Sequence, residues 1–169
     1  MSRIESLAET VESRLAGRAN RLPSLAAELA YEVDAARWVE VATELRDDQD
    51  LAFEQLVDLS GIDYLHYGKS EWRTAAASSS GFSRAATRGA GQPPEDPSRR
   101  FVVTAHLLSV SRNQRIRLRC HCEGAEPPMA DSLVGVWPSA NWFEREAFDL
   151  FGIVFRGHPD LRRILTDYG

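Results

Sequence analysis

Cysteine is scarce in this sequence, and its scarcity excludes several kinds of cofactor site. The 169 residues include two cysteines, Cys120 and Cys122, and four dispersed histidines. An iron–sulfur cluster needs about four cysteine ligands, and a structural zinc site needs about four cysteine or histidine ligands at short paired spacings. We therefore expect no metal site in this chain. On a strand, both cysteines would point to one face as small buried apolar groups.

Long hydrophobic runs and a strong positive charge are lacking as well. No stretch reaches the ~18 consecutive apolar residues of a membrane-spanning helix, and the N-terminus has no signal-peptide pattern. The net charge of −5 argues against nucleic acid as a partner, because that binding relies on positive charge. We expect a protein that stays in the compartment where it is made and contacts a membrane only through other proteins.

Hydrophobic periodicity divides the chain into helices and strands. Helices are predicted over residues 2–17, 34–45 and 53–61, and strands over the second half of 25–33 and over 62–67, 101–110 and 115–122. The last two strands are separated by a link short enough for a hairpin. Residues 129–137 are typical of either a short helix or an irregular segment. The pattern predicts an α+β fold, with a small mixed or antiparallel sheet of about four strands and helices packed on it.

The domain organisation follows from composition. Residues 69–100 are rich in Ala, Ser, Gly, Pro and Arg and have almost no apolar periodicity. They exceed the roughly 12 to 15 residues usual for an ordered loop, so we expect a flexible insertion in which Trp72 and Phe82 dock on a partner. We expect residues 1–152 to form a single core domain and residues 153–169 an extended C-terminal segment that docks on a partner subunit.

A basic stripe marks the second strand of the hairpin. Its members alternate with apolar residues and are Arg115, Arg117, Arg119 and His121. Such a stripe is usually a solvated face. It is also a suitable seat for acidic side chains, either Glu144 and Glu146 or those of a partner.

The segment 141–152 combines many aromatic residues with four charges, and we expect it to form a helix. Asn141 and Glu144 have the spacing of a capping box, and Gly152 is suited to the other end. With about 100° of rotation per residue, Glu146 falls between Trp142 and Leu150, inside an apolar arc.

Three charged positions on this helix carry specific expectations. Glu144 also falls among aromatic residues, so both it and Glu146 should have a specific partner, because an isolated buried charge is very costly. That partner is either the backbone or an arginine of this chain, or another protein that covers the helix. Arg145 lies opposite the apolar arc, so we expect Arg145 and Asp149 to face outward.

The tail that follows the helix is basic and rich in turns. Its short apolar start, residues 153–155, leads into residues 156–165, whose order should depend on what they lie against. His158 precedes a proline, which favours an extended backbone. A backbone-bonded loop histidine is the simpler interpretation of His158, and a catalytic histidine is the alternative.

This constellation resembles the signature of the 30-kDa subunit family of respiratory complex I, which includes the C subunit of bacterial NADH-quinone oxidoreductase. The resemblance rests on charged and apolar positions at fixed spacing, namely Glu144-Arg145-Glu146, Asp149-Leu150-Phe151, His158, Arg162 and Arg163-Ile164-Leu165. Weaker similarity covers residues 56–64, 101–122 and 131–141. The insertion 69–100 is longer than in many relatives. The chain also stops at Gly169, where the family usually continues, so we expect a truncated form.

The resemblance implies a peripheral-arm subunit without a redox centre, beside the quinone-site subunit and an adjacent cluster-bearing subunit. NADH, FMN, the iron–sulfur clusters and quinone would be bound by other subunits. The complex would lie on the cytoplasmic side of the bacterial inner membrane. The resemblance implies no catalytic, cofactor or metal residue here. It assigns folding and contact with the neighbouring subunit to Glu144, Arg145, Glu146, Asp149, His158 and Arg162, and Arg163 adjoins them.

Two alternatives remain open from the sequence. The related subunit of a membrane-bound nickel–iron hydrogenase complex belongs to the same family. An independent acid/base enzyme would use Glu144, Glu146 and His158, because aromatic surroundings raise the pKa of a carboxyl group. No nucleophile motif or phosphate-binding glycine loop accompanies these residues.

Overall fold

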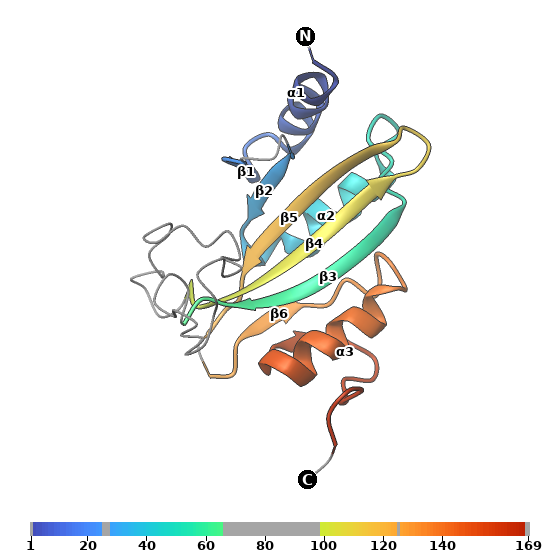
Figure 1. Ribbon diagram of the computed structural model, residues 1–169. Helices are drawn as coiled ribbons and strands as arrows, with labels where there is room; N and C mark the ends of the chain where they lie inside the picture. The colour runs from blue at the N-terminus through green and yellow to red at the C-terminus, as the bar shows by residue number, and fades with distance from the viewer. Residues whose placement is uncertain (1, 25–27, 66–98, 125, 168–169) are drawn as a thin grey trace, which may run out of the picture.

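A mixed five-stranded sheet forms the centre of the molecule (Figure 1). The computed structural model describes residues 2–24, 28–65, 99–124 and 126–167. The strand order is β1-β2-β5-β4-β3, with β2 parallel to β5 and the other neighbours antiparallel. A separate parallel pair joins β6 to β7. In chain order the elements are α1 (Arg3–Leu15), β1 (Ala19–Leu22), β2 (Ala30–Val33), a 3-10 turn (Ala35–Arg37), α2 (Trp38–Asp47), β3 (Gln55–Asp63), β4 (Phe101–Ser109), β5 (Gln114–His121), β6 (Met129–Asp131), α3 (Ala140–Phe151) and β7 (Val154–Arg156).

The α+β class and the single domain are confirmed, and the main sheet has one strand more than the four expected. The additional strand is β1, which is short and has only half-buried and exposed residues. It was not predicted from the sequence, because its apolar pattern is weak. It forms the edge of the sheet by pairing Ala19–Leu22 with β2.

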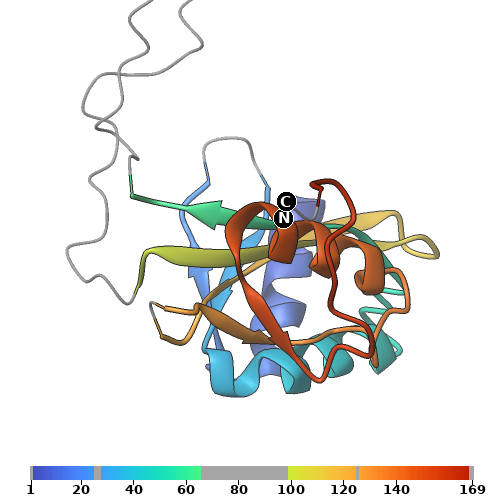
Figure 2. The same cartoon turned by 90° about the horizontal axis from the view of Figure 1, so that it is seen from below.

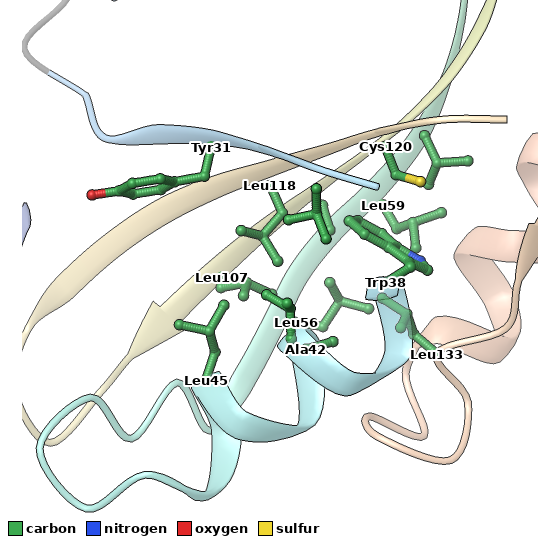
Figure 3. Close-up of a cluster of buried hydrophobic side chains, with 14 of the residues drawn as sticks. Tyr31, Trp38, Ala42, Leu45, Leu56, Leu59, Leu107, Leu118, Cys120 and Leu133 are labelled. Atoms are coloured by element: carbon green, nitrogen blue, oxygen red, sulfur yellow. The ribbon is translucent and has the colours of Figure 1, made fainter. Parts of the chain in front are cut away.

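The core lies between the sheet and the helices that cover one of its faces. Figure 3 shows α2 beneath the strands, with Trp38, Leu45 and Leu118 among the side chains packed between them. Trp38, Val41, Ala42 and Leu45 of α2 are all fully buried, as their helical spacing predicts. In α1 the Ser2 side chain accepts a hydrogen bond from the Glu5 N–H, which confirms the predicted cap.

The hairpin of β4 and β5 matches its prediction closely. The middle strand β4 is buried on both faces for much of its length, as expected for a strand with neighbours on either side. In β5, Ile116, Leu118 and Cys120 are buried while the arginines between them are at least partly exposed. Cys120 and Cys122 are both free and buried. Burial raises the pKa of the Cys122 thiol to about 12 and the pKa of the Cys120 thiol further still.

The helix predicted over residues 53–61 is wrong, because this segment belongs to strand β3. The strand pairs with β4 from Gln55 to Asp63, and its register shifts between Leu56 and Asp58. That bulge adds a residue to one side of the ladder and interrupts the period of two. The apolar residues Phe53, Leu56 and Val57 therefore imitate helical spacing.

Helix α3 packs against β3 at a point where the strand has no side chain. A Cβ atom at Gly61 would lie 2.7 Å from Cδ2 of Phe151 and 2.9 Å from Cδ1 of Ile153. Glycine is therefore required for the helix to approach the strand this closely. The strand β3 is the edge of the sheet opposite β1, and Figure 2 shows the C-terminal segment lying next to α3.

Residues beside two expected boundaries have contacts with the rest of the domain. Ile153 and Phe155, placed in a separate tail from residue 153 onward, are buried in the core. Most of the expected insertion lies outside the described residues, including Trp72 and Phe82. Its last two residues are described, and each forms an ion pair: Arg99 with Glu32 and Arg100 with Asp63.

Candidate functional site

Helix α3 and the tail after it carry the motif residues, and α3 turns a different face inward from the one predicted. The buried positions are Ala140, Glu144, Arg145 and Ala147. The stripe of Trp142, Glu146 and Leu150 faces outward, with Trp142 63% and Leu150 52% exposed. Glu146 is therefore exposed rather than buried within this chain. Trp142 and Leu150 flank Glu146 on this stripe, and both are exposed as well. The alternative that another protein covers this side of the helix stays a prediction.

Glu144 is the buried acid of the motif, with no exposed surface. Its two carboxylate oxygens accept hydrogen bonds from the Ser132 hydroxyl and from the Leu133 N–H, each at 2.6 Å. Burial raises the pKa of the Glu144 carboxyl to about 7, against the opposing effect of these two donors. The predicted capping box with Asn141 is wrong, since the helix begins at Ala140 and Glu144 instead holds the segment that precedes the helix.

Arg145 is 5% exposed, which contradicts its predicted outward position. Its Nε–H donates to the carbonyl oxygen of Arg162 at 3.3 Å, and its guanidinium lies 4.8 Å from the centre of the Trp142 ring. The tail folds back over this side of the helix and covers it. A helical wheel contains no information about a covering segment that follows the helix.

Asp149 binds the tail through several donors at once. One carboxylate oxygen accepts the backbone N–H groups of Ile164, Leu165 and Thr166 at 3.0, 2.7 and 2.9 Å, and the other accepts the Thr166 hydroxyl. The Thr166 hydroxyl, followed by the backbone donors, holds the pKa of the Asp149 carboxyl far below its usual range. Asp149 is half-buried beneath the tail rather than facing outward freely.

His158 bonds to backbone through both ring nitrogens. The Asp160 N–H donates to Nδ1 at 3.0 Å, so Nε2 carries the proton and donates to the Asn141 carbonyl oxygen at 3.1 Å. This confirms the simpler interpretation of His158 as a backbone-bonded loop histidine. The histidine ties the tail to the first turn of α3.

Arg162 and Arg163 keep their side chains outside. The Arg162 Nε–H donates to Asp160 at 2.8 Å, and both of those side chains are more than half exposed. Arg163 donates to the Asp167 carbonyl oxygen at 2.9 Å. Next to them Leu165 is 61% exposed.

The outward residues of helix and tail form one surface, because Asp149 holds Leu165 against the helix. We call this surface the docking face and define it as Trp142, Glu146, Leu150, Arg162 and Leu165. Exposed large apolar groups together with arginine are typical of protein interfaces, where tryptophan and arginine are enriched. The remaining motif residues, Glu144, Arg145, Asp149 and His158, are used internally.

The acid/base alternative gains nothing from this geometry. Glu144 is fully buried, Glu146 is exposed on the stripe, and both nitrogens of His158 are occupied. A general acid or base must be within reach of the proton that it moves. Glu144 meets only Ser132 and Leu133 as hydrogen-bond partners in the described part of the chain.

The basic stripe of β5 finds its acids on the neighbouring strand region rather than on α3. Arg119 donates to Glu32 at 2.6 and 3.1 Å, and Arg117 lies 3.5 Å from Glu28. Parallel pairing of β2 with β5 places Glu32 beside Arg119. The suggestion that Glu144 or Glu146 sits on this stripe is therefore wrong.

Sequence reasoning missed Ser132 and Thr166, which complete the two carboxylate sites. Both are single hydroxyl residues in irregular segments, 12 and 17 residues from the acids they bind. Neither has a periodic or motif signal. Their roles follow only from how the chain folds back on α3.

The described ranges contain neither a metal-binding cluster nor a membrane-spanning helix. No group of three or more His, Cys, Asp or Glu side chains there is placed to hold a metal ion. None of the helices in those ranges has the length and apolar character needed to cross a bilayer.

Comparison with known proteins gives one consistent result. The family described as "Respiratory-chain NADH dehydrogenase, 30 Kd subunit" matches residues 31–169. The C subunit of NADH-quinone oxidoreductase from Xanthomonas campestris pv. campestris is 46% identical, over 97% of this chain and 72% of that protein. The protein of the same name from Halorhodospira halophila is 45% identical, over 100% of this chain and 74% of its own length.

Two solved structures share the fold. A trypsin-resistant fragment (1-134) of Nqo5 superposes with a TM-score of 0.65 and 27% identity, covering 95% of this chain and 100% of that one. A chain of an archaeal membrane-bound sulfane sulfur reductase superposes with a TM-score of 0.60 at 15% identity, over 99% of this chain and 79% of that chain, and shows the fold alone. With the matched family and the curated relatives, these findings show that this chain belongs to the 30-kDa subunit family of respiratory-chain NADH dehydrogenase.

Proposed function

We propose that this chain is a non-redox structural subunit of the peripheral arm of a proton-translocating NADH:quinone oxidoreductase, where it supports the quinone-reducing module. The observation behind this proposal is that the motif residues have two separate roles, one inside the chain and one on its surface. Its buried charges fasten the tail to α3, and the fastened unit presents a docking face with three large exposed apolar side chains.

The docking face fits a protein partner better than a small molecule. Trp142 and Leu150 lie on one stripe of a helix, and Leu165 extends that stripe onto the tail. Burying such groups against a partner removes apolar area from water, at about 25 cal/mol per Å². Glu146 and Arg162 would give the contact its orientation, because charged groups at an interface mainly determine specificity.

The proposed partners are the quinone-site subunit and the adjacent cluster-bearing subunit. In this arrangement the chain binds no cofactor itself, and NADH, FMN, the iron–sulfur clusters and quinone belong to other subunits. The count of two cysteines supports this, since a cluster needs about four. The proposed location is the cytoplasmic side of the bacterial inner membrane, with membrane contact through the assembled complex.

Deleting the chain from its own cell tests the proposal. Membranes should lose NADH:quinone reductase activity and the assembled quinone-reducing arm, and both should return when the chain is supplied again. The purified chain should contain no flavin or iron and show no turnover. Iron bound to the purified chain in stoichiometric amounts would contradict the proposal.

The nickel–iron hydrogenase alternative is not favoured, because the curated relatives described above are NADH-quinone oxidoreductase subunits. The identity of the subunits that purify with the native chain separates the two. The acid/base enzyme would require activity in the isolated chain that Glu146→Gln abolishes. The exposed position of Glu146 and the occupied ring of His158 argue against it.

A further inference from the structure

A hollow lies on the opposite face of the sheet from the helices, away from the docking face. In Figure 1 this outer face is turned toward the reader, with α2 behind the strands. The hollow has a volume of about 420 Å³ and is lined by strands β3, β4 and β5, by Tyr64 just after β3, and by Leu22 and Pro23 at the end of β1. Its polar lining residues are Ser60, Tyr64, Thr104, His106, Arg117 and Arg119.

Strand register brings the polar lining residues together in two rows. Ser60 pairs with Thr104, which in turn pairs with Arg119 on β5. His106 and Arg117 form the adjacent row, two residues along each strand. Residues two apart on a strand point to the same face, so hydroxyl groups and guanidinium groups converge on this hollow.

The charged side chains that line the hollow are positive. They are Arg117 and Arg119. The acids that neighbour the lining, Glu28, Glu32 and Asp58, are outside it. Arg119 is fixed in place, because it donates to Glu32 on one side and to the Tyr64 hydroxyl at 3.4 Å on the other. Arg117 is held loosely, since its acid lies at 3.5 Å and is 57% exposed.

Thr104 on strand β4 has a buried hydroxyl group whose lack of a partner is not explained by its place in the strand. The residue is 5% exposed, and its hydroxyl oxygen has no hydrogen-bond partner among the described residues. A buried hydroxyl without a partner costs about 1–3 kcal/mol. It is an O–H donor beside two guanidinium groups, and an oxyanion is the group that accepts from all three.

We propose that this hollow is a binding site for a small oxyanion, either a carboxylate or a phosphate. Arg117 would supply the main charge, Arg119 a pre-positioned guanidinium, and the hydroxyls of Thr104 and Ser60 the remaining donors. Guanidinium groups match the planar geometry of carboxylate and phosphate oxygens. The inference does not depend on the proposed function, because it concerns the other face of the sheet.

Titration of the full chain with inorganic phosphate and, separately, with succinate tests the site, at constant ionic strength with chloride as the balancing anion. Backbone amide shifts of Thr104 and Arg117 are followed by NMR. We expect saturable shifts with at least one probe, and the probe that saturates at the lower concentration identifies the class. Arg117→Met should weaken binding by about tenfold or more.

Two further variants keep the test decisive. Arg115→Met removes an exposed arginine from the same strand but outside the hollow, and it should leave binding unchanged. Thr104→Val should weaken binding while raising Tm without ligand, because it removes the unpartnered buried hydroxyl. The absence of a saturable shift with either probe, or equal binding by wild type and Arg117→Met, would overturn the proposal.

Discussion

At the scale of single residues, Glu144 is the most consequential side chain of the motif. It has no exposed surface, yet it holds the Ser132 hydroxyl and the Leu133 N–H that fix the approach to α3. Ser132 also accepts a hydrogen bond from the Val134 N–H at 3.2 Å. Because a hydroxyl can accept as well as donate, this site can satisfy both a charged and a neutral carboxyl group.

The buried carboxyl should make stability depend on pH. Its pKa is raised from an ordinary glutamate value to about 7, so its favourable contribution is fully present below the unfolded-state pKa. That contribution is lost as the pH rises through about 7. The free energy of unfolding of the wild type should therefore fall by up to about 1.4 kcal/mol per pH unit as the pH rises toward 7. We expect Glu144→Gln to remove this dependence.

Urea unfolding at about pH 5, 6 and 7 measures this slope. Glu146→Gln is the matched control, because it neutralises an exposed carboxyl two residues away on the same helix. The control should keep the slope of the wild type. The same slope in Glu144→Gln would show that Glu144 does not titrate in this range.

We expect Arg145 to contribute mainly to the stability of the folded chain. It is buried between Trp142 and the tail, so Arg145→Ala should lower the free energy of unfolding by about 1–3 kcal/mol through lost packing and a lost hydrogen bond to the Arg162 carbonyl. Arg115→Ala, at an exposed strand position, should change it by less than about 0.5 kcal/mol. Equal effects of the two changes in urea unfolding would contradict the burial of Arg145.

At the scale of elements, α3 is fastened on two sides. Gly61 lets it approach β3, and the tail closes over its other side through Asp149 and His158. The helix itself was predictable, because its aromatic load and Gly152 mark its body and its end. Its orientation was not predictable from the wheel, since exposed Trp142 and Leu150 look like core residues in sequence.

Gly61→Ala tests the contact between β3 and α3. The added Cβ would meet the Phe151 ring and the Ile153 side chain well inside normal contact distance, so we expect a loss of about 1–3 kcal/mol in the free energy of unfolding. Gly135→Ala is the control, since apart from its own chain neighbours no heavy atom lies within 4 Å of its added Cβ. A neutral Gly61→Ala in thermal or urea unfolding would mean that the helix sits farther from the strand.

Asp149→Asn tests the closure of the tail. The variant loses a charged acceptor for three N–H groups and the Thr166 hydroxyl, so amide hydrogen exchange at Ile164, Leu165 and Thr166 should rise by about tenfold or more. The core should be unaffected. Asp160→Asn, whose side chain pairs only with exposed Arg162 in the described chain, should leave these amides protected. Unchanged amide exchange in Asp149→Asn would contradict the fastening of the tail by Asp149.

The limits of prediction at this scale have identifiable causes. Strand β5 was predictable because its period of two is uninterrupted, and strand β4 because a run that is apolar on both faces is typical of a central strand. Strand β3 was not, because a bulge between Leu56 and Asp58 breaks its period. The partners Ser132 and Thr166 could not be inferred, since their contacts depend on long-range folding of irregular segments.

At the scale of the whole molecule, the two faces of the sheet have different characters. One carries the helices and the core (Figure 3), and the other carries the ion pairs of β5 and the oxyanion hollow. The spacing of the charged motif residues was enough to indicate the family. It did not show that most of these residues are used inside the chain and that the stripe between them faces outward.

The central claim is that the docking face joins this chain to its complex. Co-purification of partner subunits from cells that express Glu146→Lys/Leu150→Ser tests it most directly, because neither side chain has a hydrogen bond or ion pair within the described ranges. We predict that this variant loses the partner subunits while its Tm stays within about 2 °C of wild type. Val110→Ser, a change of an exposed apolar residue just after β4, should retain them. Full retention of the partner subunits by Glu146→Lys/Leu150→Ser would contradict the claim.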